Sequence, residues 1–174
     1  MYTIRPAQDA DMTAIAAIYS HYVLGSTCTF ETVPPTPQDM AARRAEVLSR
    51  GLPWLVAQDP DGSLLGYAYC NWFKPRPAYR HSAENSIYLS HTAVGRGVGR
   101  RLLDALCEAA LAAGVRQVIA VIGGADNVAS IGLHRKAGFG DAGVLQSAGW
   151  KFDRWLDVVL MQKPLGDGDS SSPG

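Results

Sequence analysis

A glycine-rich turn between a strand and a helix is the feature that most restricts how this chain can fold. The turn, VGRGVG from Val94 to Gly99, follows the stretch Ala83–Leu89, which is predicted to be a strand. A strand, a turn and a helix in this order bring backbone N–H groups and a helix N-terminus together, which predicts an anion site. The predicted helix has one apolar face, formed by Leu102, Leu103, Leu106, Cys107 and Ala110.

The turn allows three interpretations. A dinucleotide-binding turn lies early in a βαβ unit and is followed by an acidic residue about 20 residues later, whereas most of this chain precedes Val94. A nucleoside-triphosphate loop ends in Gly-Lys-Ser/Thr, and this turn continues into Arg100 and Arg101. The third interpretation is a turn without a ligand. Arg96, Arg100 and Arg101 add positive charge beside the turn, and its glycines would let a phosphate approach because they have no Cβ.

The remaining pattern is that of one α/β domain over residues 1–165. Short apolar runs predict strands, and apolar residues at helical spacing, bounded by capping residues and glycines, predict helices. The further strands are predicted at 2–5, 54–58, 64–72, 117–122, 144–150 and 155–162, and the further helices at 12–22, 36–49 and 127–137. The run 117–122 is interpreted as a strand covered on both faces. Residues 166–174 lack apolar side chains and are expected to form a disordered tail.

Charge and composition exclude several kinds of partner. The chain has 174 residues with 16 Lys and Arg against 16 Asp and Glu, so it lacks the basic excess of a nucleic-acid or membrane-surface binder. Cys28, Cys70 and Cys107 have neither a metal-ligand nor a CxxC spacing, so no metal site is expected and the cysteines are interpreted as small, largely buried side chains. Without a signal-peptide pattern or a long apolar stretch, a cytoplasmic location is expected.

Several segments on either side of the glycine-rich turn match the pattern of a known family. After the next predicted strand comes NVASIGLHRKAGF, from Asn127 to Phe139. In this order the chain resembles the GCN5-related N-acetyltransferases (GNAT). The segments HYVLGSTCTFE, FKPRPAYR and AGWKFDRWLDVVLMQ are similar to the branch that acetylates phosphinothricin and methionine sulfoximine.

The resemblance implies a fold and a reaction. The fold would be an α/β GNAT fold, with a mixed, mostly antiparallel twisted sheet, helices on both faces and a V-shaped splay for acetyl-CoA. Acetyl-CoA would be the co-substrate, without a metal, and a small amino-acid-like amine would be the acceptor in a direct transfer. The resemblance also implies a homodimer.

Two residues are candidates for the proton transfers. Glu84 alternates with Ser86 and Tyr88 on one face of its strand, and the resemblance implies that its carboxylate is the base; the alternative is a solvated or ion-paired strand residue. His134 comes two helical turns after Asn127, and the resemblance implies that its imidazole protonates the CoA sulfur. The alternative for His134 is a packed or capping histidine.

The resemblance also implies where acetyl-CoA binds. A backbone N–H near Leu89 would hold the oxyanion. The residues expected to contact acetyl-CoA are Tyr88, Leu89, Ser90, Val94, Gly95, Arg96, Gly97, Val98, Gly99, Arg100, Asn127 and Ser130. Val94 stands where the family usually has Gln or Arg, so one side-chain contact is expected to be lost.

Two loops are candidates for the acceptor site. In the basic loop before Glu84, Lys74, Arg76 and Tyr79 would bind a carboxylate and a second polar group of the acceptor. A solvated basic loop is the alternative. In the long loop after the first helix, Phe30 is expected to form a pocket wall or a lid, and its neighbours Thr29 and Glu31 share this expectation.

The acceptor itself is left open. Leu103 replaces a tyrosine of the phosphinothricin enzymes, so methionine sulfoximine or methionine sulfone is an equally good prediction. Another amine, such as a protein N-terminus or a polyamine, is the alternative among enzymes. A non-catalytic acetyl-CoA sensor is the alternative outside enzymes.

Overall fold

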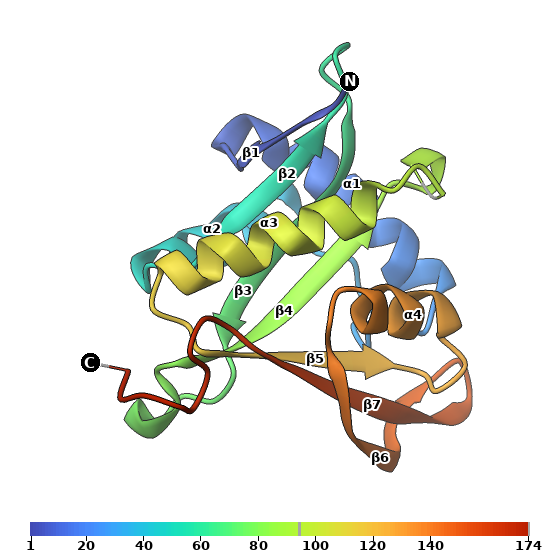
Figure 1. Ribbon diagram of the computed structural model, residues 1–174. Coiled ribbons are helices and arrows are strands. Elements are labelled where there is room, and N and C mark those ends of the chain that lie inside the picture. Colours follow the sequence, from blue (N-terminus) through green and yellow to red (C-terminus); the bar gives the residue numbers. More distant parts are fainter. Residues whose placement is uncertain (94, 174) are drawn as a thin grey trace.

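A seven-stranded sheet forms the centre of the molecule in the computed structural model, which describes residues 1–93 and 95–173 (Figure 1). The strands lie in the order β1-β2-β3-β4-β5-β7-β6. Their bounds are β1 Thr3–Pro6, β2 Trp54–Gln58, β3 Leu64–Trp72, β4 Ser82–Leu89, β5 Gln117–Gly123, β6 Gly140–Lys151 and β7 Arg154–Pro164. All neighbouring pairs are antiparallel except β4 and β5, which are parallel. The predicted mixed, mostly antiparallel sheet is confirmed.

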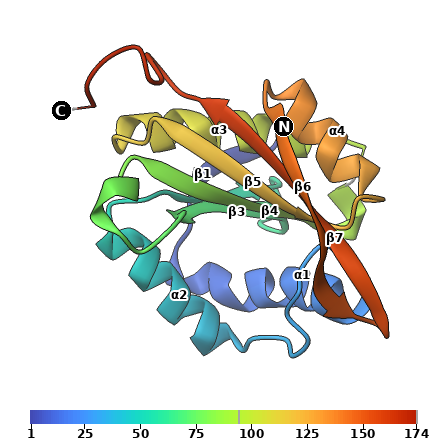
Figure 2. The same cartoon turned by 90° about the horizontal axis from the view of Figure 1, so that it is seen from below.

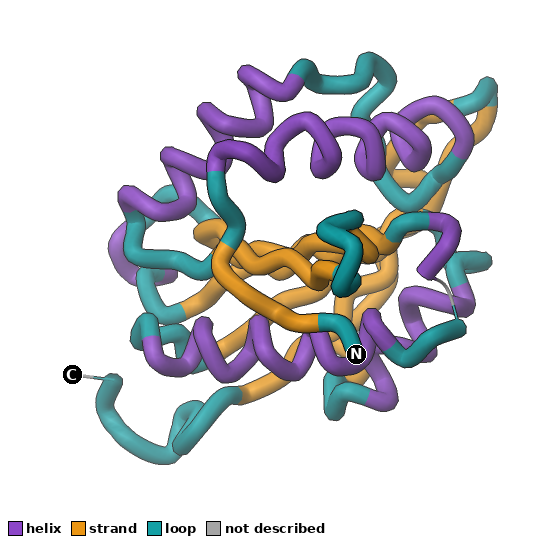
Figure 3. The backbone as a smooth tube through the Cα atoms, turned by 90° about the horizontal axis from the view of Figure 1, so that it is seen from above, coloured by secondary structure: helices purple, strands orange, loops and turns teal. Residues whose placement is uncertain are grey.

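Four α-helices in the described ranges cover the two faces of this sheet. They are α1 Met12–Gly25, α2 Pro37–Ser49, α3 Val98–Ala112 and α4 Val128–Lys136. Figure 2 shows α1 and α2 on one face and α3 and α4 on the other, and Figure 3 shows the resulting helix, sheet and helix layers. None of the described helices is long and apolar enough to cross a bilayer.

Local signals decide where the helices begin and end. At the start of α2, Thr36 Oγ1 accepts a hydrogen bond from the Asp39 N–H at 3.1 Å, and the Asp39 carboxylate accepts one from the Thr36 N–H at 2.8 Å. This is a capping box. After α3 and α4 the chain turns at Gly114 (φ +86°) and Gly138 (φ +90°), a conformation that favours glycine. The predicted helix ends are therefore confirmed.

The core fills both faces of the sheet, under α1 and α2 on one side and under the apolar face of α3 on the other. Leu102, Leu103 and Leu106 have no exposed surface, as the helical spacing predicts. Cys70 and Cys107 are buried and Cys28 is half-buried, and all three are free thiols. The prediction for the cysteines is confirmed.

The sheet opens between β4 and β5. The two strands are paired from Ser82 opposite Gln117 to Asn85 opposite Ala120. Beyond this point residues 86–89 and 121–123 are not paired with each other, and Figure 1 shows β4 and β5 running apart. The V-shaped splay is confirmed, and it leaves the backbone groups of β4 without a strand on that side.

Two segments differ from the sequence prediction. The β5 strand is not covered on both faces, because Val121 is 37% exposed beside the opening. The C-terminal segment, expected to be disordered, forms turns that contact Arg116. The Arg116 guanidinium donates to the Gly168 carbonyl at 3.2 Å and to Ser171 Oγ at 2.6 Å, which supplies hydrogen bonds that the tail composition does not predict.

Candidate active site

A cleft of about 820 Å³ lies where β4 and β5 separate. Its walls come from α1 and the loop after it, from β3, β4 and β5, from the turn before α3, and from α4. Most of the predicted site residues line it. They are Phe30, Glu84, Tyr88, Leu89, Gly95, Gly97, Val98, Gly99, Arg100, Asn127, Ser130 and His134.

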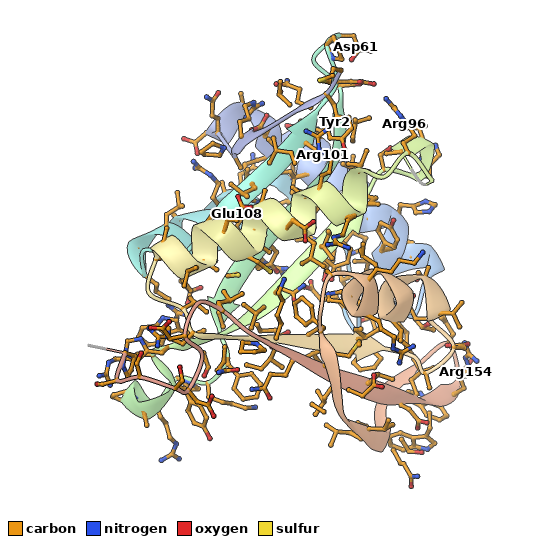
Figure 4. All side chains as sticks on the ribbon, viewed as in Figure 1. Tyr2, Asp61, Arg96, Arg101, Glu108 and Arg154 are labelled. Carbon is orange, nitrogen blue, oxygen red and sulfur yellow. The ribbon has the colours of Figure 1, made fainter. Side chains whose placement is uncertain are left out.

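Other predicted residues lie outside the cleft. Arg96 forms an ion pair with Asp59 at 3.2 Å and lies on the turn before α3 (Figure 4). Ser90 uses its hydroxyl in a 2.9 Å hydrogen bond with Thr92 Oγ1. Neither of them lines the cleft. Val94 lies outside the described residues.

The basic loop before β4 does not reach the cleft within one chain. Lys74, Arg76 and Tyr79 are all exposed, and none of them lines it. Phe73 holds the loop outward, because the Tyr79 ring packs edge-on against it and the Lys74 ammonium lies 5.2 Å from its ring centre. Burial raises the pKa of Glu84, and Lys74 still acts on the cleft because its charge opposes this rise.

The glycines before α3 have conformational roles. Gly95 (φ +82°) and Gly97 (φ +74°) adopt the left-handed conformation, and a Cβ added to either would meet no atom within 4 Å. A Cβ on Gly99 would lie 3.1 Å from the Leu89 side chain. From the sequence, these glycines are expected to let a phosphate come close to the backbone. In the structure, Gly95 and Gly97 permit the turn, whereas Gly99 permits the packing of β4 on α3.

The N-terminal end of α3 faces the cleft. The first N–H groups of a helix have no partner inside it and lie at the positive end of its dipole. Val98, Gly99 and Arg100 begin α3 and line the cleft. The Arg100 side chain is held by Asp104 at 2.6 Å and by the Lys136 carbonyl. The predicted charge of Arg101 is directed elsewhere, onto the Tyr2 ring (Figure 4).

Residues of β4 alternate between the two faces of the sheet. The Tyr88 ring packs against Tyr19 of α1 with 4.8 Å between ring centres. The Leu89 side chain lies on the other face, against Gly99 of α3. Because successive strand residues point to opposite faces, Glu84 lies on the α1 and α2 face. Glu84 and His134, which is on α4, therefore approach the cleft from opposite faces of the sheet.

The backbone of Leu89 is directed into the opening. The Ser90 N–H donates to the Leu65 carbonyl of β3 at 2.9 Å. Since neighbouring residues of a strand direct their N–H groups to opposite sides, the Leu89 N–H points away from β3. The Leu89 carbonyl accepts a 2.6 Å hydrogen bond from the Tyr22 hydroxyl, which fixes this peptide at the edge of the cleft.

Glu84 is a half-buried carboxylate without a protein donor in the described ranges. Burial raises its pKa, and the nearby ammonium of Lys74 offsets part of the rise. A carboxylate with a raised pKa binds a proton more readily than one in water. Glu84 can therefore take a proton from a group in the cleft.

His134 is almost completely buried and uses both ring nitrogens. Nδ1 lies 2.8 Å from the Ser130 carbonyl oxygen, and Nε2 lies 2.9 Å from Asn85 Nδ2. Burial lowers the pKa of His134, and the hydrogen bond to Ser130 offsets part of this effect. Asn127 caps α4 by accepting from the Ser130 N–H at 3.2 Å, and it also donates to Cys28 Sγ.

The loop after α1 is held from both sides of the cleft. Thr29 Oγ1 and Glu31 Oε1 lie 2.6 and 2.9 Å from the Tyr19 hydroxyl, and burial raises the pKa of Tyr19 to about 12. From the opposite side, Lys151 at the end of β6 donates to the Ser26 carbonyl at 2.7 Å and to the Thr29 carbonyl at 2.8 Å. This keeps the loop, and Phe30 within it, against the cleft.

Comparison with known proteins agrees with this geometry. A family model described as an acetyltransferase (GNAT) domain matches residues 4–160. The chain belongs to this acetyltransferase family. It is 51% identical to a phosphinothricin N-acetyltransferase of Alcaligenes faecalis, over 98% of this chain and 86% of that protein. It is 41% identical to an L-methionine sulfoximine/L-methionine sulfone acetyltransferase of Pseudomonas aeruginosa, over 98% of both chains.

A solved structure gives the same result for this acetyltransferase. The crystal structure of a phosphinothricin acetyltransferase from Sinorhizobium meliloti in complex with AcCoA is similar with a TM-score of 0.96. It is 44% identical and the match covers 99% of this chain and 93% of that chain. The GNAT fold expected from the sequence is confirmed.

Sequence reasoning missed four residues of this acetyltransferase that build the cleft: Tyr19, Tyr22, Asn85 and Lys151. Both tyrosines lie in the predicted first helix, whose spacing says nothing of their hydroxyl partners: Thr29 and Glu31 in the following loop for Tyr19, and the distant Leu89 carbonyl for Tyr22. The signal for Lys151 was present, since it is a single cation between Trp150 and Phe152. Conversely, Leu103 is fully buried and does not line the cleft, so its difference from the phosphinothricin enzymes changes the packing of α3.

Proposed function

We propose that this acetyltransferase transfers the acetyl group of acetyl-CoA to the α-amino group of a small amino-acid analogue of the phosphinothricin, methionine sulfoximine or methionine sulfone type. The observation that carries the proposal is the opening between β4 and β5. It joins the N-terminus of α3 and the carboxylate of Glu84 in one cleft. The activities named for the relatives support the acceptor class.

The cleft suits acetyl-CoA as co-substrate. The amides at the start of α3 fit its pyrophosphate. The free side of β4 offers backbone donors and acceptors to its amide-containing arm, and the Leu89 N–H is suited to the thioester oxygen. When bound, acetyl-CoA supplies the activated acetyl group, and the residues of this chain bind and orient it.

Glu84 is the proposed base. An amino acid at neutral pH carries an ammonium group, which has no lone pair and must lose a proton before it can attack the thioester. The carboxylate of Glu84, on the α1 and α2 face, would accept this proton directly or through a water. Its raised pKa strengthens it as a base, but protonation would remove the base as the pH falls. We expect kcat/KM to decrease as the pH falls through the pKa of Glu84.

His134 is the proposed proton carrier on the sulfur side. In the neutral ring its proton lies on Nδ1, against the Ser130 carbonyl. Donation to sulfur therefore requires a second proton on Nε2. The proposal predicts that His134→Ala lowers kcat, provided that product release is not rate-limiting.

The acceptor side is proposed to be lined by Phe30 and influenced by Lys74. Phe30 is 38% exposed at the cleft, which is consistent with a wall that contacts the acceptor. The charge of Lys74 acts on Glu84 and would attract the acidic group of the acceptor. The binding of the acceptor by Arg76 and Tyr79 stays a prediction.

The deciding experiment mixes the protein with acetyl-CoA and a panel of amines and measures the release of free thiol. The panel contains L-phosphinothricin, L-methionine sulfoximine, L-methionine sulfone, a polyamine and a peptide with a free N-terminus. Faster thiol release with the three analogues supports the proposal. Release only with the peptide or the polyamine would favour another acceptor, and tight acetyl-CoA binding with no release would favour a sensor.

Glu84→Gln tests the proposed base. We expect a decrease in kcat/KM of about 100-fold or more, the usual contribution of a general base. The control is Glu108→Gln, which changes an exposed carboxylate on α3 (Figure 4) and should leave turnover unchanged. Full activity of Glu84→Gln at every pH would refute the assignment.

We also propose that the protein is a homodimer, and that β6 and β7 take part in the contact. Apolar side chains on these strands and on the turn between them are at least half exposed, namely Val144, Leu145, Trp150, Phe152 and Trp155. Exposed apolar patches of this kind are typical of protein interfaces. Analytical ultracentrifugation should show a dimer that dissociates in Trp155→Glu. A cytoplasmic location, and the lack of nucleic-acid and membrane partners, remain predictions from the composition.

A further inference from the structure

Asn85 and His134 form a buried pair where β4 separates from β5. Asn85 is the last residue of β4 that is paired with β5, and both side chains line the cleft. Asn85 is 6% exposed and His134 is 2% exposed. We propose that Asn85 is a positioning residue that holds His134 as a neutral imidazole with its proton on Nδ1, and that His134 gains a second proton only when the Asn85 amide turns over.

The first part of this proposal follows from the partners of the two ring nitrogens. Nδ1 lies 2.8 Å from the Ser130 carbonyl oxygen. A carbonyl oxygen only accepts hydrogen bonds, so Nδ1 carries the proton and Nε2 of the neutral ring has a lone pair. The side-chain amide of Asn85 must then present its NH₂ group to Nε2, which is the arrangement found at 2.9 Å. If Oδ1 of Asn85 faced Nε2 instead, two hydrogen-bond acceptors would lie against each other.

The second part follows from the other end of the Asn85 amide. Oδ1 of Asn85 is buried and has no hydrogen-bond partner among the described residues. If Nε2 took up a proton, its N–H would face the NH₂ group of Asn85, and two donors would repel each other. Half a turn of the amide would bring Oδ1 to the Nε2–H. Protonation of Nε2 already removes the hydrogen bond between Asn85 Nδ2 and Nε2. Because Oδ1 has no partner, rotation of the amide breaks no further hydrogen bond of Oδ1.

The surroundings of the imidazole contain no charge that could replace Asn85. On α4, the Ser130 hydroxyl lies 3.4 Å from Nδ1. Between α4 and β6, the Phe139 ring packs edge-on with 5.0 Å between ring centres. No charged side chain of the described ranges acts on the ring, and burial lowers its pKa. The neutral form is therefore favoured at neutral pH.

The consequence for catalysis rests on the proposed function. A proton taken from solvent in the cleft would bind to Nε2 after Asn85 has turned, and Oδ1 would then accept from Nε2–H. Transfer of this proton to the sulfur of the departing CoA breaks the Nε2–H bond and forms an S–H bond. The imidazole returns to its neutral form, and Asn85 turns back. Asn85 would thus control when His134 can act as an acid.

The test of the proposal is ¹⁵N NMR of the histidine-labelled full chain, recorded without substrates. His134→Gln identifies the signals of His134 among those of the other histidines. From about pH 6 to 8 we expect a protonated Nδ1 and an unprotonated, hydrogen-bonded Nε2. A neutral ring with its proton on Nε2, or an imidazolium at neutral pH, would overturn the proposal. This result is independent of whether the protein acetylates any amine.

Asn85→Asp tests the role of the amide directly. A carboxylate accepts from Nε2–H without turning, so the pKa of His134 in the same titration should rise by about 1 or more. Asn85→Leu, which has a similar shape and no polar atom, should raise it less. The control is Gln117→Glu on β5, outside the cleft, which should leave it unchanged. An unchanged pKa of His134 in folded Asn85→Asp would overturn the proposal, and if this variant does not fold, the wild-type spectrum decides.

Kinetics distinguish positioning from a structural role. Asn85→Asp should shift the pH dependence of kcat, whereas the KM for acetyl-CoA should change little. A residue that only supports the fold would lower kcat without moving the pH profile. The pH profile of kcat could stay in place although the NMR titration shows a raised pKa of His134. In that case Asn85 does not control the acid step, and the hydrogen-bonded pair of Asn85 and His134 is still supported.

Discussion

The two ends of the cleft are built in different ways. The turn before α3 takes its shape from Gly95 and Gly97, which adopt a left-handed backbone conformation. A Cβ added to either glycine would meet no atom within 4 Å. The loop of residues 26–31 contains no glycine. Its shape comes from Tyr19 on one side and from Lys151 on the other.

The difference separates local from distant control. A short motif is enough to form the turn, because the conformation depends on residues inside it. The loop depends on partners far along the chain, including Asn127 against Cys28 and Lys151 against Ser26. Changes in the turn should therefore affect acetyl-CoA binding, whereas changes in the C-terminal strands should affect the acceptor side.

The largest expected effect on stability comes from Lys151→Met. The substitution removes the donor of two carbonyls, one of them buried, and leaves those carbonyls without partners. We expect the free energy of unfolding to fall by about 2 kcal/mol or more, measured by urea denaturation, and the KM for the amine to rise. Lys163→Met is the control, because Lys163 donates to a single carbonyl, that of Ala137. Equal losses in the two variants would show that the loop is not held by Lys151.

The next effect tests the turn. Gly97→Ala forces a residue with a Cβ into φ +74°, although it meets no atom there. We expect a loss of about 1 kcal/mol and a higher KM for acetyl-CoA with an unchanged KM for the amine. Gly25→Ala, at the end of α1, is the control, since its Cβ is also free and its φ is not positive. A change in the KM for the amine alone would contradict the assignment of this end of the cleft.

A smaller effect is expected for Glu31→Gln, which breaks the double hydrogen bond from Arg43 (2.6 and 2.9 Å). Burial raises the pKa of Glu31, but hydrogen bonds from Arg43 and Tyr19 outweigh it and lower the pKa overall. The stabilisation is therefore complete above the unfolded value of about 4.3 and is lost as the pH falls below it. The variant should lose about 1 kcal/mol or less at neutral pH, since the pair is partly exposed.

Denaturation at neutral and acidic pH checks this prediction. Wild type should lose more stability than Glu31→Gln when the pH falls below the range in which the carboxylate is charged. Glu46→Gln is the control, because Glu46 pairs with Arg50 on the surface of α2 and does not touch the loop. Identical pH dependence of wild type and Glu31→Gln would exclude a role for the pair in holding the loop.

The smallest effect on stability is expected for Gly149→Ala. A Cβ at this position would lie 2.7 Å from the Phe30 ring, which is partly exposed and can move away. We expect a loss below about 1 kcal/mol, a raised KM for the amine and an unchanged KM for acetyl-CoA. Phe30→Ala should also raise the KM for the amine. If Gly149→Ala raises only the KM for acetyl-CoA, Phe30 does not belong to the acceptor side.

Much of the fold was predictable because its signals are local. The start of α2 at Thr36, the glycine after α3 and the apolar face of α3 each depend on neighbouring residues, and each was predicted from the sequence. The basic loop was harder to place. Lys74 and Arg76 look like ligands for an anion, but the contact of Tyr79 with Phe73 and the exposure of the loop follow from packing.

By itself, the sequence determined the helix and strand pattern, the position of the glycine-rich turn before α3, and the placement of Glu84 on a strand and His134 on a helix. These depend on backbone preferences and spacing, which act over a few residues. Only the tertiary structure decided that Glu84 and His134 reach the cleft from opposite faces, that Asn85 meets Nε2, and that Lys151 holds the first loop. The reason is physical, since hydrogen bonds between residues far apart in the chain exist only in the folded protein, where β4 and β5 diverge and the C-terminal hairpin packs beside them.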